Sequence, residues 1–114
     1  MPAVAGASPR RRISGLPDRG RVHSSGYVES VTLAPADDPP RFTAVLGELQ
    51  GAYRDPSASV ARRRVRLIWV GQRRIPGIVA GTQVAFEGMV SPVNGIPTVF
   101  NPRYEIIGRP EGAQ

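Results

Sequence analysis

Short stretches in which large apolar residues alternate with other residues constrain this fold more than any other feature. Val65, Leu67 and Trp69 occupy every second position between Arg63 and Val70. A period of two is that of a β-strand with one face turned toward a core. The 114 residues include 13 glycines and 12 prolines. These residues interrupt each stretch before a helix could form. The chain is therefore expected to be all-β.

The same reasoning predicts five strands, at Arg21–Leu33, Arg41–Leu49, Arg63–Val70, Thr82–Val90 and Ile96–Ile107. The dipeptide Asn94-Gly95 is typical of a tight hairpin, because both residues tolerate a positive φ. Asn101-Pro102 should bend the fifth strand, since proline cannot donate a hydrogen bond to a neighbouring strand. Residues 71–78 are expected to form a short non-helical plug between the third and fourth strands, because Pro76 and Gly77 break a helix.

Five strands and a plug favour a five-stranded Greek-key barrel of the OB-fold type over residues 20–108. A β-sandwich is the second choice, but it usually needs about seven strands. Phe42, Trp69 and Phe86 share the phase of the apolar positions and are predicted to lie in the core. Residues 1–19 are rich in small and basic residues and are predicted to form a flexible basic arm, with 109–114 as a short tail.

The charge balance points to an anionic partner. All 15 basic residues are arginine, against 9 acidic residues, which gives a formal charge of +6. A guanidinium group binds phosphate in a bidentate manner and stacks on bases, so a small basic domain is a candidate nucleic-acid binder. The competing interpretation is solubility alone. The chain has no cysteine, which excludes disulfides and thiolate zinc sites, and neither a metal nor another cofactor is expected.

Membrane and export signals are not visible in the sequence. It contains no run of about 18 apolar residues, the length that a membrane-spanning helix needs. The first residues include a basic cluster, but no apolar stretch of a secretory signal follows it. A cytoplasmic protein is expected.

The sequence contains few residues that could act in catalysis. His23 is the only histidine and lies beside Ser24 and Ser25 without a neighbouring carboxylate to complete a triad. The chain has no lysine, and the segment from Gly71 to Gly77 lacks the Lys-Ser/Thr ending of a phosphate-binding loop. The protein is therefore predicted not to be an enzyme.

The arginines around the third strand form the candidate binding site. Arg64 and Arg66 alternate with core residues and should point outward, beside Arg41 on the second strand, with Arg73 and Arg74 at the rim. Such a stripe could follow the phosphates of a single strand. The alternative is a solvated strand face whose charges prevent edge aggregation.

Aromatic side chains that could stack on bases are fewer. Trp69 is assigned to the core, which leaves Tyr27, Tyr53 and Tyr104 as candidates. Weak binding that depends mainly on phosphate contacts is therefore expected, and the sequence shows no sign of base specificity.

Two blocks of the chain resemble a known family. The first runs from Val65 to Ile78, containing Trp-Val-Gly-Gln-Arg-Arg-Ile-Pro-Gly, with Gly81 beyond it; the second is Asn101-Pro102-Arg103-Tyr104-Glu105. They resemble a family of small actinobacterial OB-fold proteins classed as nucleic-acid-binding domains. The resemblance implies an OB barrel and a nucleic-acid ligand. Two differences stand out: the connection at 50–61 is longer, and cysteines that precede the barrel in some relatives are missing.

Three functions remain open after these observations. The first is a module for single-stranded DNA or RNA, with contacts predicted at Arg41, Arg64, Arg66, Arg73, Arg74, Arg103 and Tyr104. The second is a protein-interaction module whose arginine-rich face docks an acidic or exposed-edge partner. The third is an OB adaptor that keeps the fold without binding nucleic acid.

Overall fold

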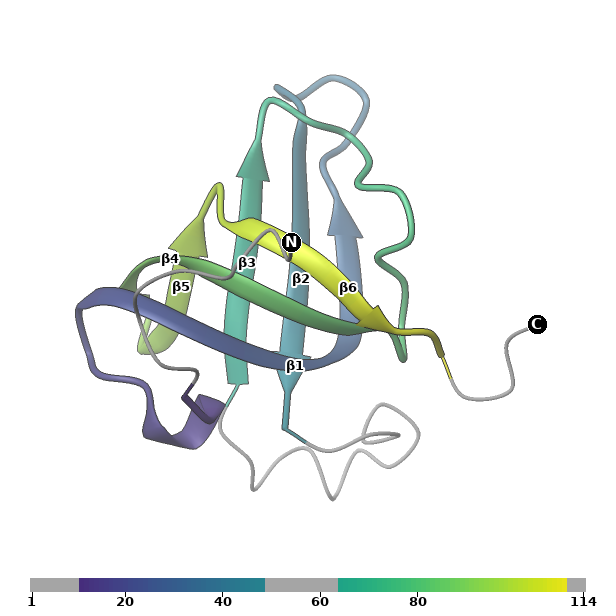
Figure 1. Ribbon diagram of the computed structural model, residues 1–114. Coiled ribbons are helices and arrows are strands. Elements are labelled where there is room, and N and C mark those ends of the chain that lie inside the picture. The colour runs from purple at the N-terminus through teal and green to yellow at the C-terminus, as the bar shows by residue number, and fades with distance from the viewer. Residues whose placement is uncertain (1–10, 49–63, 111–114) are drawn as a thin grey trace.

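The computed structural model describes residues 11–48 and 64–110. This part of the chain holds six strands and one short 3-10 helix, and the prediction of an all-β protein is confirmed (Figure 1). The elements are η1 (Ile13–Gly15), β1 (Gly20–Leu33), β2 (Arg41–Gly47), β3 (Arg64–Val70), β4 (Gln83–Val93), β5 (Ile96–Phe100) and β6 (Arg103–Gly108). No helix in the described ranges is long and apolar enough to cross a membrane.

Five of the strands form a closed ring. β1 pairs with both β2 and β4, β2 pairs with β3, and β5 lies between β3 and β4. The pairing of β3 with β5 is parallel and the others in the ring are antiparallel. In Figure 1, β4 and the first part of β1 cross the view, while β2 and β3 stand upright and run in opposite directions. A sheet that returns to its first strand in this way has a barrel-like form.

The core fills this ring from the inward face of every strand. Leu46, Leu67 and Phe86 are completely buried, and Trp69 packs edge-on against Phe42 with ring centroids 6.0 Å apart. The prediction that Phe42, Trp69 and Phe86 lie in the core is confirmed. The plug residues Ile75 and Ile78 lie between β3 and β4 and are buried as well, at 3% and 2% exposure. The predicted non-helical plug is thus observed.

The second half of the chain differs in detail from the predicted strands. β4 continues to Val93, past the predicted end at Val90, and its Pro92 lies opposite Pro97 of β5. The hairpin turn is therefore only Asn94-Gly95, with φ of 53° and 79°. This tight turn lets the two strands pair up to their ends.

The predicted fifth strand is two strands. It is divided at Asn101-Pro102, where a bend was expected, and Asn101 has a φ of 52°. β5 and β6 each pair antiparallel with a different part of β4. Pro102 lacks a backbone N–H, and the positive φ of Asn101 turns the chain, so the strand ends at Phe100 and restarts at Arg103.

The predicted flexible arm at 1–19 is wrong for residues 11–19. Arg11 N donates to His23 O at 2.7 Å, and η1 follows directly. Ile13 is completely buried and Leu16 is 6% exposed, so both belong to the core. Gly26 makes room for this segment, because a Cβ there would lie 2.5 Å from Ile13 Cδ1. Two apolar residues were enough to anchor the segment. Residues 1–10 and 111–114 lie outside the described residues.

Candidate nucleic-acid interface

The outward side of β1, β2, β3 and β5 presents a row of directly paired residues. In strand order the row consists of Thr32, Thr43, Ile68 and Phe100. They face outward because their sequence neighbours Ala44, Leu67 and Val99 are completely buried in the core. The row therefore crosses four strands on one surface.

Two arginines flank this row. Arg41 lies two residue pairs beyond it at the start of β2, and Arg66 lies two pairs before it on β3. Together these six residues line an open groove: Thr32, Arg41, Thr43, Arg66, Ile68 and Phe100. Arg66 pairs with Val45, which lies four residues after Arg41 on β2. The levels of the two arginines are therefore about 13 Å apart along the strands, at ~3.3 Å per residue. The open groove thus has an apolar and hydroxyl-bearing middle between two cationic ends.

Phe100 is the aromatic residue among the four open-groove residues that were not predicted from the sequence, the others being Thr32, Thr43 and Ile68. Its side chain is 49% exposed, which is unusual for a phenylalanine. Asn101 fixes its position: Asn101 N donates to Ile68 O at 2.6 Å, and its Oδ1 accepts from Val70 N at 2.9 Å. The signal was available in the sequence, because Phe100 follows the inward residue Val99 just before a predicted bend. An exposed ring beside two guanidinium groups can stack on a base.

Arg64 lies on the same face as Arg66 but has an acidic partner. Its Nε is 3.1 Å from Glu29 Oε1, and the Glu29 side chain is only 10% exposed. The carboxylate fits there because Gly47 has no side chain, and a Cβ at that position would overlap Glu29 Oε2. Burial raises the pKa of Glu29 above its ordinary value, while the charge of Arg64 acts in the opposite direction. Arg64 is therefore partly neutralised.

The two rim arginines have different surroundings. Arg73 Nη2 donates to the carbonyl oxygens of Ala36 and Asp38, at 3.3 and 3.1 Å. It thereby ties the plug to the loop between β1 and β2. Arg74 is exposed. Gly71 N also donates to Pro40 O at 2.9 Å, which holds this end of β3 beside the start of β2. Arg73 is thus a structural clamp as well as a rim charge.

Arg103 and Tyr104 do not join the open groove. Both belong to β6, which pairs with β4 at Glu87 and Phe86 rather than with β3. The Tyr104 ring packs edge-on against Trp69, with centroids 5.5 Å apart, and is half-buried. Tyr104 is therefore corrected from a stacking candidate to a residue at the edge of the core. Of the other tyrosine candidates, Tyr53 lies outside the described residues.

The outward side of β1, β4 and β6 differs in character. There His23, Glu87 and Arg103 are directly paired across the three strands. Glu87 is 3% exposed and His23 is 8% exposed, although both lie on the outer surface of the ring. Arg21 forms an ion pair with Glu87, with Nε and Oε2 3.5 Å apart. We call this surface the closed face.

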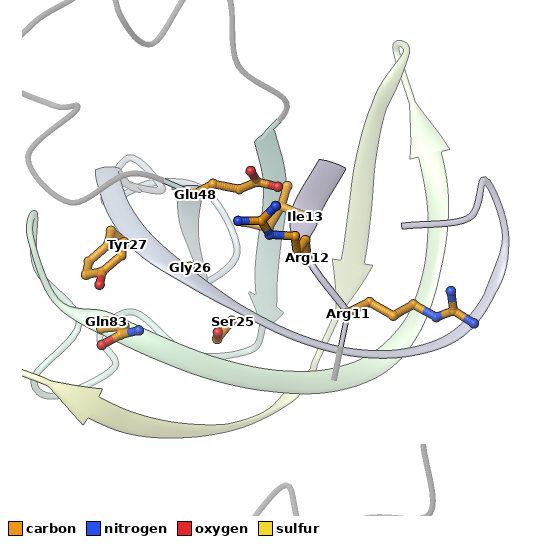
Figure 2. Close-up of a pocket in the computed structure, with 8 residues that line it drawn as sticks. All are labelled: Arg11, Arg12, Ile13, Ser25, Gly26, Tyr27, Glu48 and Gln83. Carbon is orange, nitrogen blue, oxygen red and sulfur yellow. The ribbon is translucent and has the colours of Figure 1, made fainter. Parts of the chain in front are cut away.

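Two more hollows lie away from the open groove. One is a polar pocket lined by Arg11, Arg12, Ile13, Ser25, Gly26, Tyr27, Glu48 and Gln83 (Figure 2). The other is mostly apolar and includes Val79, Ile106 and Ile107, which are 51%, 38% and 37% exposed. Among residues 11–48 and 64–110, no three His, Asp or Glu side chains gather closely enough to hold a metal ion.

Comparison with known proteins gives no match. No protein-family model fits the chain, and neither the curated proteins nor the solved structures include one that is significantly similar to it. The resemblance to small actinobacterial OB-fold proteins therefore stays a prediction, and the function is argued from the geometry of the chain itself.

Proposed function

We propose that this protein is a non-enzymatic OB-fold module that binds single-stranded DNA or RNA in the open groove. The ring order β1-β2-β3-β5-β4, with β3 parallel to β5, supports the OB assignment. OB barrels bind oligonucleotides on the face of their second and third strands. Arg41, Thr43 and Arg66 lie on that face here.

The observation that carries the proposal is the exposed Phe100 ring between two arginines. A buried phenylalanine stabilises the core by packing. Phe100 is 49% exposed, so it contributes little to the core. Stacking of a base on Phe100 would place the adjoining phosphates toward Arg41 and Arg66. Because a base must be unstacked from its neighbours to lie on the ring, a single strand fits this surface better than a duplex does.

Fluorescence anisotropy tests the proposal. Labelled single-stranded DNA, single-stranded RNA and duplex DNA are titrated with the full chain at low and high salt. Single strands are expected to bind more tightly than the duplex, and the affinity should fall steeply as salt rises. An Arg41→Ala/Arg66→Ala variant should lose at least about tenfold in affinity, the effect of about 1.4 kcal/mol.

The matched control is Arg103→Ala/Arg109→Ala. It removes the same number of charges at exposed positions outside the open groove. Equal losses in both double variants would mean that net charge alone attracts the nucleic acid. No binding by the unmodified chain at low salt would reject the proposal and favour the protein-docking alternative.

A further inference from the structure

The polar pocket of Figure 2 lies on the same surface as the open groove. Tyr27 of β1 pairs directly with Gly47 of β2, and Gly47 pairs with Arg64 of β3. On its other side Tyr27 pairs with Gln83 of β4. A second row therefore crosses four strands, and it consists of Gln83, Tyr27, Gly47 and Arg64. On β2 this row lies at Gly47, four residues after Thr43 of the row through Phe100.

On this surface the residues between the two rows are Ser30, Val45 and Arg66, which are directly paired across β1, β2 and β3, and the Glu29–Arg64 pair lies at the second row. Gly47 contributes no side chain, and Glu29 lies over it toward Arg64. The distance from Phe100 to Tyr27 spans three strand spacings of ~4.8 Å across the sheet and four residues of ~3.3 Å along it. The diagonal is therefore about 20 Å long. Stacked bases are ~3.4 Å apart along one strand, so this path corresponds to about six nucleotides.

The chemistry of the polar pocket suits a nucleotide. Its lining includes Ser25, Gly26 and Tyr27 of β1, Gln83 of β4, and Arg12 and Glu48. Figure 2 shows Tyr27 and Gln83 near each other, and Arg12 close to Glu48. The Ser25 hydroxyl, the Gln83 amide and the Tyr27 hydroxyl can exchange hydrogen bonds with a base edge, while Arg12 supplies a phosphate contact.

The segment that forms one wall is held firmly. Ser14 N donates to Glu48 Oε2 at 2.5 Å, and Ser24 Oγ donates to Arg11 O at 2.6 Å. Buried Ile13 anchors the same segment between them. Arg12 is thus an exposed cation on an ordered support, so fixing it over the pocket costs less side-chain and backbone entropy than it would on a free chain.

We infer that the polar pocket is a second nucleotide subsite, occupied by the same strand that lies in the open groove about six nucleotides away. The inference rests on the proposed function. The subsite would take one nucleotide of a single strand, with Arg12 on its phosphate and Tyr27, Ser25 and Gln83 on its base. Short oligonucleotides would occupy the open groove alone, whereas longer ones would bridge both sites.

A length series tests the inference. Oligothymidylates of about 4 and about 12 nucleotides, within the range of site sizes of OB folds, are titrated by anisotropy with the full chain. A groove of about four nucleotides has about nine registers on the longer oligonucleotide and one on the shorter, so the longer one should bind about ninefold more tightly on statistical grounds and at least about tenfold more tightly beyond that. In an Arg12→Ala/Gln83→Ala variant this extra gain should disappear, while the affinity for the short oligonucleotide changes by less than about twofold.

The controls separate the two proposals. Arg109→Ala removes one exposed charge outside the polar pocket and should keep the full length dependence. The single variant Arg12→Ala, at an exposed position, guards against misfolding of the double variant and should lose part of the gain. An unchanged length dependence in both Arg12 variants would overturn the second subsite and leave the open groove intact. Absence of binding at either length in the unmodified chain would overturn the proposed function, and the subsite with it.

Discussion

The open groove and the closed face lie on the same barrel and carry the same kind of charge, yet they differ in what surrounds it. In the open groove Arg41 and Arg66 flank an exposed aromatic ring. On the closed face Arg21 is paired with Glu87, a carboxylate that is only 3% exposed. The comparison teaches that the number of arginines does not locate a binding surface. The position of the acidic side chains distinguishes the candidate surface, because an arginine that neutralises a buried carboxylate is less available to a phosphate.

The largest expected effect tests the aromatic side of this comparison. Phe100→Ala should weaken binding of single strands by about 5- to 150-fold, since stacking contributes ~1–3 kcal/mol per base. Met89→Ala is the matched control, because Met89 is 60% exposed and lies on the closed face. Anisotropy titrations of both variants measure the effect. Equal affinities would remove the distinction between the two surfaces.

The next effect concerns the stability of the fold, and here a substitution on the closed face should have a larger effect than one in the open groove. Arg21→Ala should destabilise the fold by about 1–3 kcal/mol, because Glu87 is too buried to be solvated when its partner is lost. Arg41→Ala should change the free energy of unfolding by less than about 0.5 kcal/mol, as a surface substitution without a buried partner does. Urea unfolding of the two variants gives the comparison. Similar losses would show that Glu87 does not depend on Arg21.

A smaller effect is expected in the salt dependence of binding. Each phosphate contact to a single strand contributes about 0.7 to the slope of log affinity against log salt concentration. Arg41→Ala/Arg66→Ala should therefore lower the magnitude of this slope by about 1.4. Arg21→Ala should leave the slope unchanged, because its charge is directed to Glu87. Titrations at several salt concentrations measure both slopes.

The smallest effect comes from Glu29, the acid beside Arg64. Its pKa is raised by burial above the ordinary value of 4.5, so the folded state binds this proton more tightly than the unfolded state. The group therefore favours folding below pH 4.5 and loses that contribution as the pH rises through 4.5 and on through the higher folded pKa. A Glu29→Gln variant should gain stability relative to the unmodified chain over this window. Thermal melts on both sides of it, with Glu105→Gln as the control, detect the difference.

Much of the architecture could be predicted because it is local. The period of two at Val65, Leu67 and Trp69 predicted β3 and its inward face, and Asn94-Gly95 predicted the hairpin. Asn101-Pro102 predicted the bend, although it ends one strand and begins another. The prediction for residues 11–19 was wrong because tertiary packing of a few apolar side chains outweighed the polar composition of the segment. Residues 11–19 read as a polar arm, but Ile13 and Leu16 are buried in the core.

The candidate site was predicted only in part, for a different reason. Arg41 and Arg66 were named from alternation, and they do line one groove. Alternation could not tell that Arg64 meets Glu29, because the two residues are 35 positions apart and meet only through the pairing of β1, β2 and β3. Nor could it place Arg103 and Tyr104, whose strand pairs with β4 instead of β3.

The sequence by itself therefore determined the strands, the turns between them and the side of each strand that faces the core, since these depend on a residue and its neighbours. Only the tertiary structure decided the ring order, the parallel pairing of β5 with β3, and the choice of which arginines meet an acid. These properties depend on register between distant segments, and a shift of one residue in register would turn every side chain of a strand to the opposite face.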